Sequence, residues 1–79
     1  MKVFVIELFT RHWIFTGVAE SKKQAFKMIH AGWDKHVAQT GAGPLRHIMS
    51  DLDIAECIRE VEVGTLYRNH EEMIQKEAS

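Results

Sequence analysis

The sequence predicts an α+β fold: a three-stranded antiparallel sheet in the chain order β-β-α-β, with strand order 2-1-3, one packed helix and a C-terminal helix. Three observations lead to this prediction. Two runs rich in Val, Ile and Phe lie at residues 2–9 and 13–19, an amphipathic segment occupies 22–39, and an alternating segment occupies 55–63. With 79 residues, of which 46% are apolar and 27% charged, the chain is expected to form a single domain over 1–79.

The first two runs are expected to form a hairpin. Residues 2–9 are almost continuously apolar, as in a central strand, and residues 13–19 form the second strand. The three residues between them, Thr10, Arg11 and His12, make a connection of hairpin length, although no Asn-Gly or Asp-Gly pair specifies the turn.

The segment 22–39 is the helix that the pattern predicts most clearly. Ser21 is the expected N-cap, and the glycines and proline of "TGAGP" (40–44) end the helix. At about 100° per residue one stripe of the helix is apolar, with flanking positions Phe26, Met28 and Val37. The stripe itself consists of Ala25, Ile29, Gly32, Trp33 and His36.

The last part of the chain gives weaker patterns. Residues 45–53 are ambiguous and fit a helical turn. Residues 55–63 alternate as a strand, with Ala55, Cys57, Val61 and Val63 on one face and Glu56, Glu60 and Glu62 on the other. Residues 65–79 are expected to form a C-terminal helix, because Leu66, His70, Met73 and Ile74 align on one side. A right-handed crossover between the second and third strands then places the first strand in the middle.

Both faces of this sheet are apolar, and this is the main functional observation. If a three-residue loop pairs Phe9 with Trp13, one face carries Phe4, Ile6, Leu8, Ile14 and Val18. The second face carries Val3, Val5, Phe9, Trp13 and Phe15, with Arg11 and His12 at its rim. One helix covers only one face, so the C-terminal helix, a second copy or another protein must cover the other. On this register Trp13→Ala is expected to abolish binding and Lys23→Ala to leave it intact.

Charge is divided unevenly along the chain. Residues 1–50 carry seven Lys or Arg and three Asp or Glu. Residues 51–79 carry three Lys or Arg and eight Asp or Glu, so the whole chain has a net charge of −1. The two halves either attract each other within the fold or leave a basic face for a polyanion. The alternative function is therefore nucleic-acid binding by a basic stripe of Arg11, Lys22, Lys23, Lys27 and Lys35.

No pattern in the sequence indicates catalysis, a cofactor or a metal. The five histidines show no zinc-ligand spacing, and His36 is expected to be a partly buried, hydrogen-bonded residue of the helix stripe. Cys57, the single cysteine, excludes an internal disulfide, which fits a reducing cytoplasm, and nothing near it in the sequence activates a thiol. No apolar run approaches the roughly 18 residues of a membrane helix. A non-enzymatic, cytoplasmic protein without a membrane partner is therefore expected.

A resemblance adds to this interpretation. The segments "KVFVIELFTRHWIFTGVAES", "KKQAFKMIHAGW" and "IREVEVG" resemble short, uncharacterised phage- and prophage-encoded proteins with a hairpin–helix–strand pattern. The resemblance covers residues 2–63 and implies a small accessory protein of the bacterial cytoplasm that binds and modulates a protein. It transfers no catalytic residue. The sequence therefore predicts an interaction protein that binds a protein partner or forms a homodimer.

Overall fold

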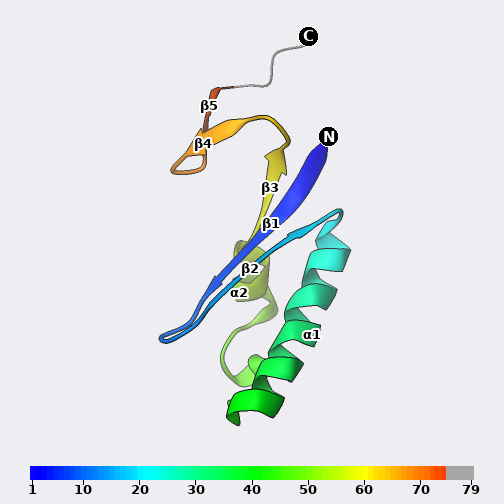
Figure 1. Cartoon of the computed structure of the whole chain (residues 1–79), viewed down its shortest axis with the longest axis vertical. Coiled ribbons are helices and arrows are strands. Elements are labelled where there is room, and N and C mark those ends of the chain that lie inside the picture. Colours follow the sequence, from blue (N-terminus) through cyan, green and yellow to red (C-terminus); the bar gives the residue numbers. More distant parts are fainter. Residues whose placement is uncertain (75–79) are drawn as a thin grey trace.

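The computed structural model describes residues 1–74 and has a three-stranded antiparallel sheet with a long helix packed on one face (Figure 1). The central strand β1 (Lys2–Phe9) pairs with β2 (Ile14–Ala19) on one side and with β3 (Ile58–Glu62) on the other. The order β2-β1-β3 confirms the predicted topology. A second, two-stranded sheet of β4 (Leu66–Arg68) and β5 (Glu71–Ile74) projects from the end where the N-terminus lies.

Helix α1 (Lys22–Thr40) has the ends that the sequence predicts. The Ser21 hydroxyl accepts a hydrogen bond from the main-chain N–H of Gln24, which satisfies one of the free donors of the first turn. Gly41 follows the helix in the left-handed conformation, at φ 74°, and its N–H donates to the Val37 carbonyl. These two caps determine where α1 begins and where it ends.

The core lies between α1 and the facing side of the sheet. Trp33, the largest of its side chains, donates from its indole N–H to the Gly43 carbonyl at 2.9 Å, so the polar atom of a buried ring is satisfied. The predicted helix stripe is confirmed at four positions, because Ala25, Ile29, Trp33 and His36 are buried. The complete apolar core is Ile6, Leu8, Ala19, Ala25, Ile29, Trp33, Leu45, Ile54 and Ile58.

The segment between α1 and β3 differs from its predicted form. A 3-10 turn, η1 (Leu45–His47), is followed by a short helix, α2 (Asp51–Glu56), so the strand predicted over 55–63 begins only at Ile58. The capping box of α2 explains the difference: the Ser50 hydroxyl accepts from the Asp53 N–H, and the Asp53 carboxylate accepts from the Ser50 N–H. This short helix buries Ile54. It also contains Ala55 and Glu56, the first two residues of the predicted strand.

The predicted C-terminal helix over 65–79 is wrong for the described residues. Residues 66–74 form the β4–β5 hairpin, and residues 75–79 of the prediction lie outside the described part of the chain. Asn69 (φ 50°) and His70 (φ 68°) are both left-handed, which is the backbone of a two-residue hairpin turn. Asn adopts this conformation more readily than most residues, and Asn69 is the signal that the helical pattern concealed.

Candidate protein-interaction site

The turn between β1 and β2 determines which side chains the site contains. Arg11 and His12 alone form its central pair, because the Thr10 N–H donates to the Trp13 carbonyl. The Thr10 hydroxyl also accepts from the Trp13 N–H at 3.0 Å and donates to the Trp13 carbonyl at 3.1 Å. This two-residue turn replaces the predicted three-residue loop. Phe9 consequently pairs with Ile14, and the predicted pairing of Phe9 with Trp13 is wrong.

The shift by one residue moves every side chain of β2 to the opposite face. Trp13 and Phe15, predicted on the uncovered face, lie on the helix side instead. The His36 ring meets the Trp13 ring at a centroid distance of 5.3 Å, the Phe15 ring at 5.2 Å and the Trp33 ring at 4.9 Å. His36 was predicted to be partly buried and hydrogen-bonded; it is buried more fully than that, at 8% exposure, and its ring packs among three aromatic rings. Trp13 and Phe15 are therefore parts of an aromatic cluster that holds α1 on the sheet.

The uncovered face of the sheet, called the open face below, consists of Val3, Val5, Glu7, Phe9, Ile14, Thr16, Val18, Arg59 and Val61. Three of the predicted contact residues, Val3, Val5 and Phe9, lie on it, and Ile14 and Val18 take the places of Trp13 and Phe15. Ile14 is 67% exposed, Phe9 65% and Val18 62%. Neighbouring exposed apolar side chains of this size are unusual on a protein surface without a partner.

An ion pair divides the open face. Arg59 on β3 donates from its guanidinium to the Glu7 carboxylate at 2.7 Å, and both side chains are about one-third exposed. Arg59 lies opposite Val5 in the sheet register, so the pair sits among apolar neighbours. Because the two charges pair with each other, the apolar character of the surrounding face is preserved, although the buried Nε of Arg59 has no hydrogen-bond partner among the described residues.

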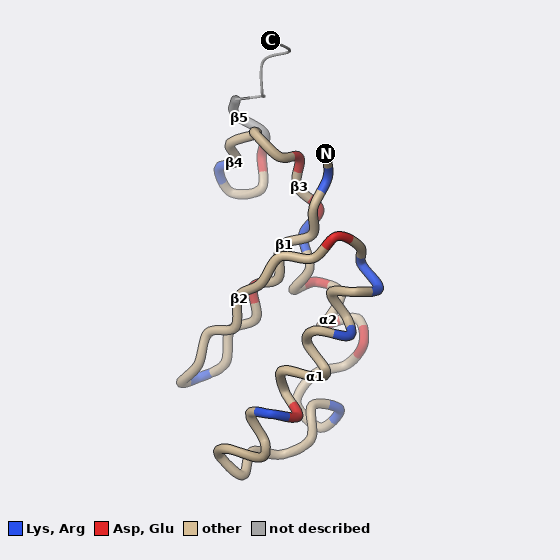
Figure 2. Tube along the Cα trace, turned by 45° about the vertical axis from the view of Figure 1, so that its right-hand side comes forward, with Lys and Arg blue, Asp and Glu red and all other residues tan. Residues whose placement is uncertain are grey.

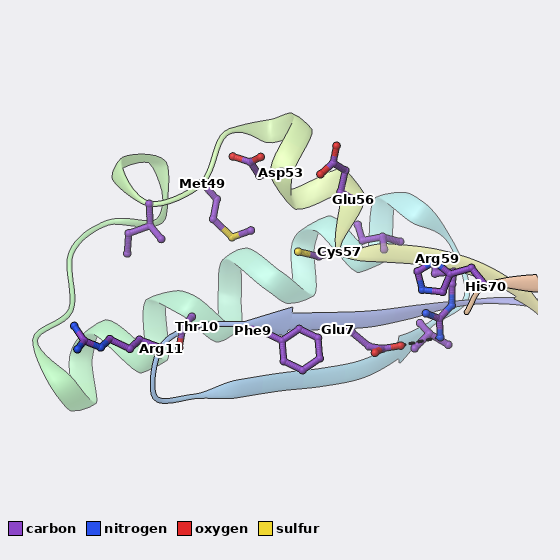
Figure 3. A pocket seen from close by; sticks show the side chains of 13 residues that line it. Glu7, Phe9, Thr10, Arg11, Met49, Asp53, Glu56, Cys57, Arg59 and His70 are labelled. Carbon is purple, nitrogen blue, oxygen red and sulfur yellow. Dashed lines mark hydrogen bonds and ion pairs between the residues drawn. The ribbon is translucent and has the colours of Figure 1, made fainter. Parts of the chain in front are cut away.

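A groove of about 820 Å³ runs beside the open face, between β1 and the η1–α2 segment (Figure 3). Phe9 of β1 lines one wall, and Met49 and Cys57 line the other. Arg11 lies at one end of the groove and His70 near the other. Its lining combines apolar side chains with five charged ones, Glu7, Arg11, Asp53, Glu56 and Arg59. Apolar walls with a few polar groups are typical of a binding groove.

The Cys57 thiol in this groove lacks the environment of a nucleophile. Partial burial raises its pKa above the ordinary value of a cysteine, and the negative charges of Asp53 and Glu56 raise it further. The thiol is consequently protonated at neutral pH, whereas nucleophilic cysteines need the thiolate. Within residues 1–74 there is likewise no group of three His, Cys, Asp or Glu side chains placed to hold a metal ion.

The five residues of the alternative nucleic-acid site do not form one continuous stripe (Figure 2). Arg11 is at the hairpin tip, whereas Lys22 and Lys23 are in the first turn of α1, next to the opposite end of β2. The six residues of β2 separate these positions by about 20 Å. Lys27 and Lys35 are exposed on the helix, with Asp34 beside Lys35. The basic residues are thus dispersed over the surface.

Comparison with known proteins adds no relative: no protein-family model matches the chain, and neither the curated proteins nor the solved structures contain a match. Along the part of the chain that the structure describes, no helix is both long and apolar enough to cross a membrane.

Three residues of the site, Ile14, Val18 and Met49, were not predicted from the sequence. Ile14 and Val18 were assigned to the helix-covered face because the loop length was overestimated by one residue. Met49, which lies between η1 and α2, also lines the groove, and α2 follows directly after it. The S-x-x-D spacing of Ser50 and Asp53 was the available signal for that helix.

Proposed function

We propose that this chain is a small interaction protein without chemistry of its own, which binds a protein partner through the open face of its sheet. The proposal includes the phage or prophage origin and the cytoplasmic setting that the resemblance implies. The observation that supports it most is the exposure of Phe9, Ile14 and Val18 on a face that no described element covers. Burying such side chains in an interface contributes about 1.5–3 kcal/mol each.

The groove beside the open face indicates which chemical groups the partner should present. The groove accommodates an apolar side chain between Phe9 and Met49, and the Arg11 guanidinium at its end suits a carboxylate or main-chain carbonyl. Large apolar residues that enter pockets dominate the binding energy of protein interfaces. The partner is therefore expected to present an apolar anchor close to an acceptor group.

The test compares two exposed apolar residues in different places. Phe9→Ser should reduce partner capture from a bacterial lysate at least tenfold, because it removes the wall of the groove. Leu52→Ser is the matched control, since Leu52 is 78% exposed on α2 and does not line the groove. Equal capture by the Phe9→Ser and Leu52→Ser variants would contradict the proposal.

A third variant distinguishes the nucleic-acid alternative. Lys23→Ala should leave capture unchanged if the open face is the binding surface. Loss of binding in this variant, with a steep fall in affinity between low and moderate salt, would instead indicate a polyanion bound to the lysines of α1.

A further inference from the structure

The two edges of the sheet differ in how well they are protected. Strand β3 carries Arg59, Glu60 and Glu62. Its outer edge is also partly bonded, because the Glu62 N–H donates to the Tyr67 hydroxyl and the Glu62 carbonyl accepts from the Thr65 N–H. Charged side chains and bonded edges are the usual protection against strand addition. Strand β2, of sequence IFTGVA, carries no charge and no proline.

The hydrogen-bond pattern shows which groups of β2 are free to pair. The Glu7 N–H donates to the Cys57 carbonyl, so odd-numbered residues of β1 direct their main-chain groups toward β3. Antiparallel ladders alternate, and the even residues of β1 therefore bond to the odd residues of β2 that face them. The outward main-chain groups belong to Ile14, Thr16 and Val18. No described residue of the chain pairs with this edge.

We propose that a second copy of this chain adds to the sheet through β2, antiparallel, with Thr16 opposite Thr16 of the second copy. Residues directly opposite each other on neighbouring strands have their side chains on the same face of the sheet. Two copies of β2 related by a twofold axis can therefore pair only in every second register. The registers centred on Thr16 and on Gly17 each overlap five residues of β2, but only the register centred on Thr16 pairs all three outward-facing residues, Ile14, Thr16 and Val18, within the strand. Three of its pairs are of the closely bonded kind, each with two hydrogen bonds, which gives about six main-chain hydrogen bonds.

The side chains are self-complementary in this register. On the open face, Ile14 lies opposite Val18 of the second copy, so two of the most exposed apolar side chains cover each other. On the helix side, Phe15 lies opposite Gly17, and Trp13 opposite Ala19. Each large ring thus meets a small residue, which favours close packing where α1 leaves limited room.

Two further features agree with a second copy as the occupant. The register brings the hairpin tip, with the positively charged Arg11, beside Glu20 of the second copy at both ends of the interface, which gives opposite charges. In addition, an apolar hollow of about 350 Å³ opens along β2 on the helix side, lined by Phe15, Gly17, Met28 and Gly32 among others. A dimer places the two hollows against each other and removes both from water.

This inference goes beyond the proposed function, because it uses the edge of the sheet and the partner uses its face. The dimer forms a continuous six-stranded sheet with both copies of α1 on the same side. The two open faces join into one surface, so the dimer is bivalent for the partner. Phe9 lies on β1, away from the new strand pair, and the Phe9→Ser variant should still dimerise. Failure of one proposal therefore leaves the other standing.

Light scattering after size exclusion tests the inference directly. The wild-type chain should change from monomer to dimer over roughly a hundredfold range of concentration, because interfaces of this small size bind weakly. Thr16→Pro should remain monomeric throughout, since it removes an outward N–H and no bond to β1. Thr16→Val keeps that N–H and should dimerise as the wild type does. A monomeric wild type, or a dimeric Thr16→Pro variant, would overturn the inference.

Cysteine cross-linking tests the register independently of how well the proline variant folds. In a Cys57→Ser background, Thr16→Cys places two thiols in a bonded pair with Cα atoms about 5.5 Å apart, within reach of a disulfide. It should form a covalent dimer on oxidation. Ile14→Cys should cross-link to Val18→Cys in a mixture and not to itself. Cross-linking by Phe9→Cys in place of Thr16→Cys would show that the copies pack face to face and refute the edge pairing.

Discussion

Thr10 determines which side chains of β2 reach the helix and which reach solvent. Its hydroxyl closes the turn by accepting from the Trp13 N–H and donating to the Trp13 carbonyl. This arrangement pairs Phe9 with Ile14 and directs Trp13 toward His36. The Thr10 side chain thereby determines that Trp13 lies on the helix side of the sheet and that Ile14 and Val18 lie on the open face.

The first prediction at this scale concerns these two neighbouring residues. Trp13→Ala should lower the free energy of unfolding by about 2 kcal/mol, roughly half the loss for a fully buried aromatic residue, because Trp13 is 52% exposed. Ile14→Ala should change it by less than about 1 kcal/mol, since Ile14 is mostly in water. Urea denaturation at low protein concentration, where the chain is monomeric, measures both. The reverse order of the two losses would support the register with a three-residue loop.

Helix α2 is the element that creates the groove. It occupies residues that would otherwise extend β3, buries Ile54 to 1% exposure, and leaves Met49 and Cys57 facing β1. Its six residues are too few for an independent helix, so the caps and the buried Ile54 must stabilise it. Two hydrogen bonds hold the pKa of Asp53 below its ordinary value. The Ser50 N–H donates the bond with the larger effect to the Asp53 carboxylate, and the Ser50 hydroxyl donates the other.

The prediction for this element follows from its cap. Ser50→Ala should lower the free energy of unfolding by about 1 kcal/mol, as loss of an N-cap usually does. The pH dependence should change as well. A depressed carboxyl pKa in the folded state contributes stability above the unfolded pKa, and this contribution is lost as pH falls through the lower, folded value.

Denaturation curves between neutral pH and the acid side of the Asp53 titration measure this change. The difference in stability between wild type and Ser50→Ala should shrink as the pH falls. Ser21→Ala, which removes the cap of α1, provides the control, because Ser21 bonds to a main-chain N–H and to no carboxylate. A wild-type advantage over Ser50→Ala that is constant with pH would contradict the role of Asp53 in the capping box.

The whole molecule exposes more surface than a compact monomer of its mass. Its accessible surface is 6244 Å², against about 4,900 Å² expected for 9.1 kDa. Its radius of gyration is 14.4 Å, against about 12 Å for a compact domain of this length. The projecting β4–β5 hairpin accounts for part of both differences, and the open face and the β2 edge supply apolar surface that association would bury.

The prediction at this scale concerns the hairpin. A chain ending at Gly64 should keep the three-stranded sheet and α1, because none of the core residues in the described part of the chain lies beyond Ile58. The loss should be about 2 kcal/mol, because Glu62 loses two hydrogen bonds worth about 1 kcal/mol each: the one that its N–H donates to the Tyr67 hydroxyl and the one that its carbonyl accepts from the Thr65 N–H. Circular dichroism and thermal melting measure the fold, and light scattering measures the association. Association of the shortened chain beyond that of the wild type would mean that removal of residues 65–79 uncovers either the open face or the outer edge of β3, which Thr65 and Tyr67 otherwise bond.

The amino-acid sequence by itself determined the parts of this protein that depend on local pattern. Runs rich in Val, Ile and Phe specified the strands 2–9 and 13–19, and a period of 3.6 residues specified the helix that begins after Ser21. Chain order with short connections then specified the sheet order β2-β1-β3. The sequence also predicted that the long helix covers only one of two apolar faces, because there are more apolar strand residues than one helix can cover, but it left open whether the C-terminal helix, a second copy or another protein covers the other face.

Only the tertiary structure decided which residues form that face. The register depends on the hydrogen bonds of one turn, and a shift of one residue exchanges Trp13 and Phe15 for Ile14 and Val18 without any change in composition. The groove also depends on α2 packing beside β1, a contact between residues far apart in the chain. Periodicity is a property of single segments. The faces of a sheet and the walls of a groove are properties of pairs of segments, so they required the fold.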